Sequence, residues 1–127
     1  MTITTGRFDL TSWDEETYDD AEGATLTRVR NTKKFEGGID GTSEANLLMA
    51  LAPQDAAVYV GIERVAAEID GRKGTFVLRH SASTAAGLDI DVVPNSGTGD
   101  LAGLRGVLAI EKSPEGEHTY SFDYELS

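Results

Sequence analysis

The sequence predicts an all-β protein: a single domain over residues 1–127, folded as one closed antiparallel β-barrel of eight strands. Fourteen glycines lie between short runs of alternating polarity, which is typical of strands joined by turns rather than of helices. About eight such runs occur, enough to close a small barrel. Hydrophobic residues make up 39% and charged residues 26%, a balance that lets a globular core form without staples.

The expected strands follow one another without a linker. They cover residues 7–11, 25–35, 42–51, 58–69, 73–80, 88–92, 104–111 and 118–126. The last is the clearest, because Tyr120, Phe122 and Tyr124 alternate with polar residues and so give one buried and one wet face. Ser43 to Leu51 has a helix-favouring composition, but its place among strands favours a strand.

Composition also restricts function. Acidic residues outnumber basic ones by 22 to 11, for a net charge of −11, which disfavours nucleic acid and anionic membranes as partners. The absence of cysteine excludes thiol nucleophiles and cysteine zinc sites. Only two histidines are present, so a multi-histidine metal centre cannot form; a mixed site of histidine and carboxylates stays open but has no supporting pattern, and no metal is expected. The glycine-rich stretch from Ser96 to Gly106 lacks the βαβ setting of a dinucleotide site, and no cofactor is expected. With no membrane-length apolar run and no leader pattern at Met1–Thr5, we expect a cytoplasmic protein.

Two charged segments each allow two interpretations. The acidic residues between Asp14 and Glu22 are expected in a loop, either as a calcium site or, better supported, as a solvated loop. Trp13 flanks this segment and is a candidate to cap a barrel mouth. On the basic strand, Arg28 and Arg30 share a face with Lys34. They form either an anion site or, as surface charges usually do, ion pairs with acidic neighbours.

A hairpin at Asp70-Gly71 allows strand register to be worked out. With a two-residue loop, Glu63 faces Leu78 and Gly61 faces His80, and cross-strand partners share a face of the sheet. Glu63 and His80 are then diagonal neighbours within reach of each other, which makes them candidate catalytic residues. Three further residues of this face are candidate substrate-binding residues: Tyr59, Phe76 and Leu78.

Gly61 lies inside the strand, where a missing side chain is expected to leave room over the imidazole. The preceding hairpin extends the cluster if its loop is 52–55, because Glu44 then faces Glu63 and Asn46 faces Gly61. Two carboxylates in a poorly hydrated site are expected to raise one pKa toward neutrality. The alternative is a satisfied polar pair, or a pair on the wet outer face.

Several phrases of the chain resemble a bacterial family known only as a domain of unknown function. They are Ser12-Trp13-Asp14-Glu15, Gly61-Ile62-Glu63-Arg64-Val65, Gly71-Arg72-Lys73-Gly74-Thr75-Phe76-Val77-Leu78-Arg79-His80 and the glycine-rich stretch from Ser96 to Gly106. That glycine-rich stretch is also similar to one in allene oxide cyclases and dirigent proteins. This wider resemblance implies an allene oxide cyclase-like barrel with an apolar lumen, in dimers or trimers.

Three hypotheses for function remain. The first is a cofactor-independent isomerase or cyclase that folds an apolar small molecule in the lumen, with Glu63 as acid or base and His80 as its partner. The second is a binding or carrier barrel without catalysis. The third is an assembly protein whose own side chains fill the lumen. A homodimer is expected in each case, because barrel exteriors of this type carry apolar residues.

Overall fold

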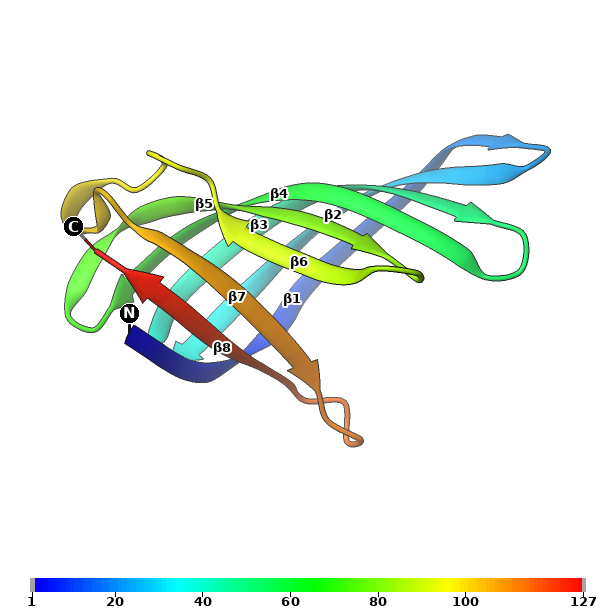
Figure 1. Cartoon of the computed structure of the whole chain (residues 1–127). Helices are drawn as coiled ribbons and strands as arrows, with labels where there is room; N and C mark the ends of the chain where they lie inside the picture. The colour runs from blue at the N-terminus through cyan, green and yellow to red at the C-terminus, as the bar shows by residue number, and fades with distance from the viewer. Residues whose placement is uncertain (1, 127) are drawn as a thin grey trace.

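The computed structural model describes residues 2–126 and confirms the predicted fold class. Eight antiparallel strands close into a barrel in chain order, with β8 pairing back onto β1 (Figure 1). They are β1 (Thr2–Ala21), β2 (Ala24–Gly37), β3 (Ile39–Ala52), β4 (Ala56–Ile69), β5 (Arg72–Ser83), β6 (Gly87–Val92), β7 (Arg105–Lys112) and β8 (His118–Glu125). Within the described residues, no helix is long and apolar enough to cross a membrane.

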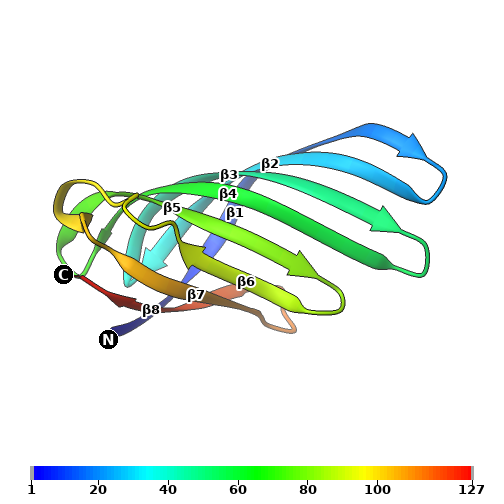
Figure 2. The ribbon, with the colours of Figure 1, turned by 45° about the horizontal axis from the view of Figure 1, so that its top comes forward.

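The two ends of the barrel differ. At one end, near both termini, the segment between β6 and β7 crosses the opening with a single 3₁₀ turn, η1 (Gly99–Leu101) (Figures 1 and 2). Leu101 and Leu104 are buried there. Gly99 and Gly103 have positive φ angles, which is why glycine suits these sharp turns. The opposite end has no such crossing segment, and the long β1–β2 and β3–β4 hairpins extend past it.

The crossing segment is anchored to β5. The backbone N–H of Thr98 donates to the Thr75 carbonyl oxygen at 2.8 Å, and the Ser96 hydroxyl accepts from the Val77 N–H at 3.0 Å. Gly74 is required at this contact, because a Cβ there would overlap the Thr98 carbonyl oxygen. We call this half of the barrel, from η1 to the layer of Phe35, the closed end.

Aromatic side chains fill the closed end. Phe122 stacks between Phe76 and Tyr124, with ring centroids 6.1 Å and 5.3 Å away. The Tyr120 hydroxyl accepts from the Ile39 N–H at 2.7 Å and donates to a neighbouring carbonyl oxygen, so this buried phenol is satisfied. Packing of this kind supplies most of the stability of a chain without disulfides.

The acidic segment is not a loop, contrary to the prediction. Residues 14–21 continue β1, and the chain turns only at Glu22-Gly23. The β1–β2 ladder carries on past the barrel rim, where Asp14 pairs with Arg30 and Glu16 with Arg28 across the strands. Ser43 to Leu51 is strand, as predicted.

The outer face of the barrel carries paired charges. Arg28 lies 3.9 Å from Glu16 and Arg30 lies 2.6 Å from Glu44, which confirms the ion-pair interpretation of these two arginines. These exposed pairs contribute little stability each.

Candidate functional site

A layer of buried polar side chains crosses the barrel just above the closed end. Lys33 of β2, Ser43 of β3, Glu63 of β4 and His80 of β5 point inward from four neighbouring strands. Each is at most 8% exposed, and Glu63 is fully buried. Charged residues are almost never buried this deeply unless paired, and here the pairing is complete. We call these four residues the polar layer.

Glu63 is the centre of the polar layer. Its carboxylate lies 2.6 Å from His80 Nε2, accepts from Lys33 Nζ at 3.2 Å on both oxygens, and accepts from the Ser43 hydroxyl at 2.5 Å. Lys33 Nζ also lies 5.1 Å from the centroid of the Phe8 ring, a cation–π contact. The carboxylate thus has donors on both oxygens, which stabilise it as an anion.

The hairpin deduction from Asp70-Gly71 is confirmed. Ile69 pairs with Arg72, so the loop has two residues, and both turn residues have the positive φ angles of a tight hairpin turn. Glu63 therefore faces Leu78, and its diagonal neighbour His80 is in direct hydrogen-bond contact.

The pKa of Glu63 departs from the prediction. Burial would raise the pKa, but the His80 hydrogen bond, the Lys33 charge and the Ser43 hydroxyl outweigh it and lower the pKa of Glu63 to about 2. A raised carboxylate pKa was expected from a second carboxylate beside it, and none is there. Glu63 is thus an ionised group at neutral pH, suited to holding His80 and Lys33 in place rather than to giving up a proton.

A cavity of about 260 Å³ opens above the polar layer, toward the end that the crossing segment leaves free. His80, Lys33 and Asn31 supply its polar lining. The remaining lining is apolar or aromatic: Phe8, Leu10, Trp13, Leu47, Met49, Tyr59, Leu88, Ile110 and His118. Burial raises the pKa of Tyr59, and the charge of Glu63 adds to that effect. An apolar pocket with a few converging polar groups is the usual form of a small-molecule site.

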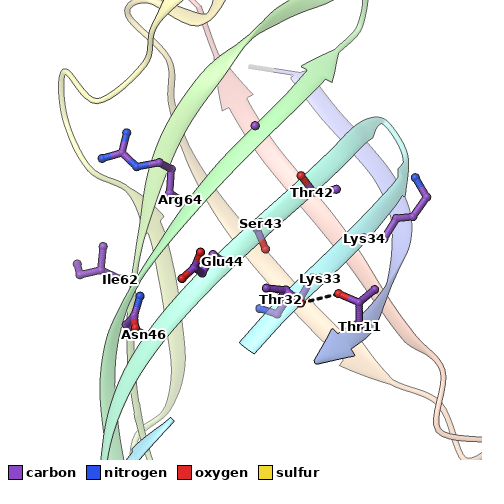
Figure 3. A pocket seen from close by; sticks show the side chains of 11 residues that line it. Thr11, Thr32, Lys33, Lys34, Thr42, Ser43, Glu44, Asn46, Ile62 and Arg64 are labelled. Atoms are coloured by element: carbon purple, nitrogen blue, oxygen red, sulfur yellow. Dashed lines mark hydrogen bonds between the residues drawn. The ribbon is translucent and has the colours of Figure 1, made fainter. Parts of the chain in front are cut away.

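Two predicted members of the site are wrong. Glu44 pairs with Arg64, and Asn46 with Ile62, so both lie on the outer face of the barrel, as Figure 3 shows. The β3–β4 loop has three residues, from Pro53 to Asp55, where four were assumed. An odd change of loop length shifts the register by one residue, which moves every side chain of a strand to the other face.

The other predicted members are divided between site and core. Tyr59, Trp13 and His80 line the cavity, with Trp13 half-exposed at its rim. Phe76 and Leu78 lie on the inner face but belong to the packed core, below the polar layer, and do not line the cavity.

Gly61 is also on the inner face, but it leaves no room over the imidazole. A Cβ at this position would overlap Cδ2 of Leu47, so the Leu47 side chain occupies the expected space. Gly61 therefore serves the packing of β3 against β4.

Sequence reasoning missed Lys33, Ser43 and Asn31. A signal existed, because Asn31 and Lys33 alternate in phase with the apolar Val29 and Phe35, which predicts that they point inward. The signal is easily overlooked because the basic residues of this strand lie on both of its faces.

A second, larger depression of about 710 Å³ lies on the outer face of β2–β4 (Figure 3). Some of its polar side chains are paired: the Thr11 and Thr32 hydroxyls lie 2.6 Å apart, and Glu44 is paired with Arg30. Surface polar groups of this kind are solvated and demand no ligand. Of residues 2–126, no three His, Asp or Glu side chains are grouped so as to hold a metal ion.

The fold and the lumen define the class of protein: a closed eight-stranded barrel with a packed half and a half that holds a polar-floored cavity. The chain belongs to the family described as "Protein of unknown function (DUF3224)", whose model matches residues 4–124. A crystal structure of a DUF3224 family protein of unknown function from Shewanella oneidensis MR-1 is 37% identical, with a TM-score of 0.92. That match covers 100% of this chain and 98% of the other.

No curated protein matches the chain. Neither match above bears on the resemblance to allene oxide cyclases and dirigent proteins, which stays a prediction.

Proposed function

We propose that the barrel binds a small, largely apolar molecule in the cavity above the polar layer. The observation that carries this proposal is the position of the polar groups: His80, Lys33 and Asn31 converge at one side of a cavity whose remaining lining is apolar or aromatic. Packed side chains fill the closed end, so a ligand would enter the barrel from the opposite, open end. The side-chain-filled barrel is disfavoured because the cavity remains at the open end.

A thermal-shift screen against apolar acids, alcohols, terpenoids and lactones tests this proposal. A ligand at a concentration well above its Kd stabilises the folded state and raises Tm by several degrees. Met49→Trp fills the cavity from β3, whereas Thr42→Trp adds the same ring to the outer face of the same strand. Binding in the lumen requires that the shift be lost in Met49→Trp and kept in Thr42→Trp. A shift that survives in both variants, or no shift with any compound, refutes the proposal.

Catalysis of an isomerisation or cyclisation is a second candidate, favoured by one observation. His80 lines the cavity while its Nε2 is held by a buried carboxylate, which is how a histidine base is commonly oriented for proton transfer. The acid–base group of this candidate is therefore His80, and Glu63 is a positioning residue. Prolonged incubation of a screening hit with the protein, followed by mass spectrometry and NMR, separates an enzyme, which returns a product, from a carrier, which returns the hit unchanged.

We also propose that the expected homodimer forms through an apolar strip on the outer face of β3 and β4, made of Leu48, Val60 and Ile62. Each of these side chains is about half-exposed. The strip lies beside arginines already paired with acidic residues, so two copies with a net charge of −11 would meet there with little repulsion. Light scattering should give a dimer that Val60→Lys dissociates. Val107→Lys, on a distant exposed valine, should leave it intact; a monomeric parent protein refutes the dimer.

A further inference from the structure

Asn31 is the one residue of the cavity lining whose buried polar atom is unpaired in the part of the chain described by the structure. It is 2% exposed, and its Oδ1 has no hydrogen-bond partner among residues 2–126. Leaving a buried amide oxygen unpaired destabilises the folded state. In the polar layer beside it, both oxygens of Glu63 have donors, so the open acceptor of the cavity lining is that of Asn31.

Asn31 lies in the wall of the cavity. It follows Lys33 on the inner face of β2, one step further from the closed end, and lies between Trp13 of β1 and Ala45 of β3. Asn31 is part of the cavity lining, although it is only 2% exposed and its Oδ1 is buried. A ligand in the cavity therefore lies against the residue that carries the unpaired oxygen, and a hydrogen-bond donor on the ligand would satisfy that oxygen.

The charges of the site disfavour an anionic ligand. Lys33 is already paired with both oxygens of Glu63 and so has little attraction left for a carboxylate. The whole chain carries a net charge of −11, which repels anions as they approach.

The rings of the lining favour a flat ligand. Phe8 and His118 stack with centroids 4.9 Å apart and planes 20° from parallel, and Tyr59 and Trp13 complete an aromatic surround. Aromatic side chains bind planar rings by stacking and edge contacts.

We infer that the ligand is a neutral aromatic alcohol, whose hydroxyl donates to Asn31 Oδ1 and whose ring lies among Phe8, Tyr59 and His118. This inference rests on the proposed binding function and names its ligand class. Three bicyclic probes of the same size separate the possibilities: 2-naphthol donates a hydrogen bond, 2-methoxynaphthalene only accepts, and 2-naphthoate is an anion.

Binding of each probe to the whole protein is measured by fluorescence titration or calorimetry. We expect 2-naphthol to bind about tenfold more tightly than 2-methoxynaphthalene, the usual effect of satisfying one buried acceptor. In Asn31→Leu the two should bind equally. Asn46→Leu, the same change on the outer face of β3, should keep the tenfold ratio. If Asn31→Leu fails to fold, Asn31→Ala provides the same comparison without added bulk.

The outcomes also separate this inference from the proposed function. Equal binding of 2-naphthol and 2-methoxynaphthalene, or tightest binding of 2-naphthoate, overturns the aromatic alcohol while leaving a binding barrel. A tenfold ratio that persists in Asn31→Leu overturns the role of Asn31. Failure of all three probes and of every screened compound overturns the binding function itself.

Discussion

The two halves of the barrel interior use the same strands in opposite ways. In the closed end, aromatic side chains such as Phe122 and Phe35 are at most 1% exposed, and the buried Tyr120 hydroxyl is satisfied by backbone groups. In the open half, Tyr59 is only partly buried, a cavity remains, and Asn31 is buried without a partner.

This difference appears within a single strand. Along the inner face of β2 the residues change from Phe35 to Lys33 to Asn31, from packed ring to paired charge to unpaired amide. A fold that needed only stability would continue the packing of the first position. The contrast places the larger hydrophobic core in the closed end and the cavity in the open half, where we propose that a ligand binds.

The largest expected effect compares an aromatic ring from each half. Phe122→Ala removes a fully buried ring stacked on two others and should lower the free energy of unfolding by about 4 kcal/mol. Tyr59→Ala removes a partly buried ring beside the cavity and should cost about 1 kcal/mol. Urea denaturation of both variants measures the difference, and equal losses would mean that the open half is as tightly packed as the closed end.

The next effect concerns the polar layer between the halves. Glu63→Leu leaves Lys33 buried without its counter-charge and should cost about 3 kcal/mol or more. Adding Lys33→Met removes the unpaired buried ammonium group, so the double variant should be more stable than Glu63→Leu alone. Glu44→Leu, which breaks the exposed pair with Arg30, should cost less than about 1 kcal/mol. A double variant no better than the single one would show that Lys33 is not held by Glu63.

The free energy of unfolding in acid should depend on the same carboxylate, that of Glu63. The pKa of Glu63 is about 2 in the folded protein against an ordinary 4.5, so the folded state binds this proton more weakly than the unfolded state does. The resulting stabilisation, about 3 kcal/mol, is present above pH 4.5 and is lost as the pH falls toward 2.

Glu63→Gln provides the reference for that measurement. The stability difference between the parent protein and Glu63→Gln should shrink as the pH falls from 4.5 to 2, as followed by urea denaturation at each pH. The pKa of Asp91 is also lowered, by its hydrogen bond with Arg79, but this exposed pair is present in both proteins and cancels. A difference that does not change with pH would show that Glu63 has an ordinary pKa.

Local chemistry explains which parts of this arrangement could be predicted. The Asp70-Gly71 turn fixes the register of β4 against β5 by itself, so the contact between Glu63 and His80 follows from sequence alone. The β3–β4 turn has no such signal, because Gln54 and Asp55 adopt positive φ angles that residues other than glycine rarely take. The misplacement of Glu44 and Asn46 follows from that one turn.

The cavity depends on information that no single strand contains. Which apolar side chains leave space is decided by packing across the barrel, as when Leu47 occupies the position left by Gly61. Lys33 shows the intermediate case: its inward direction can be read from the phase of β2, but its partnership with Glu63 needs the register of three strands.

The smallest expected change in the free energy of unfolding has opposite signs in the two halves when a buried polar group is removed. Asn31→Leu replaces an unpaired buried amide with an apolar side chain of similar size and should raise the free energy of unfolding by about 1 kcal/mol. Tyr120→Phe removes a hydroxyl that is hydrogen-bonded to the Ile39 N–H and the Glu36 carbonyl, and should lower it by about 1–2 kcal/mol. Asn46→Leu, on the outer face, should change stability by less than about 0.5 kcal/mol.

Thermal and urea denaturation of these three variants, without any added ligand, decide the point. A gain in stability at Asn31 would mean that this residue is kept at a cost to the fold, which is the expected mark of a binding group. A loss at Asn31 comparable to that at Tyr120 would mean instead that the amide is satisfied within the fold. The inference of a hydrogen-bond donor in the ligand would then lose its support, while the cavity and the polar layer beneath it would be unaffected.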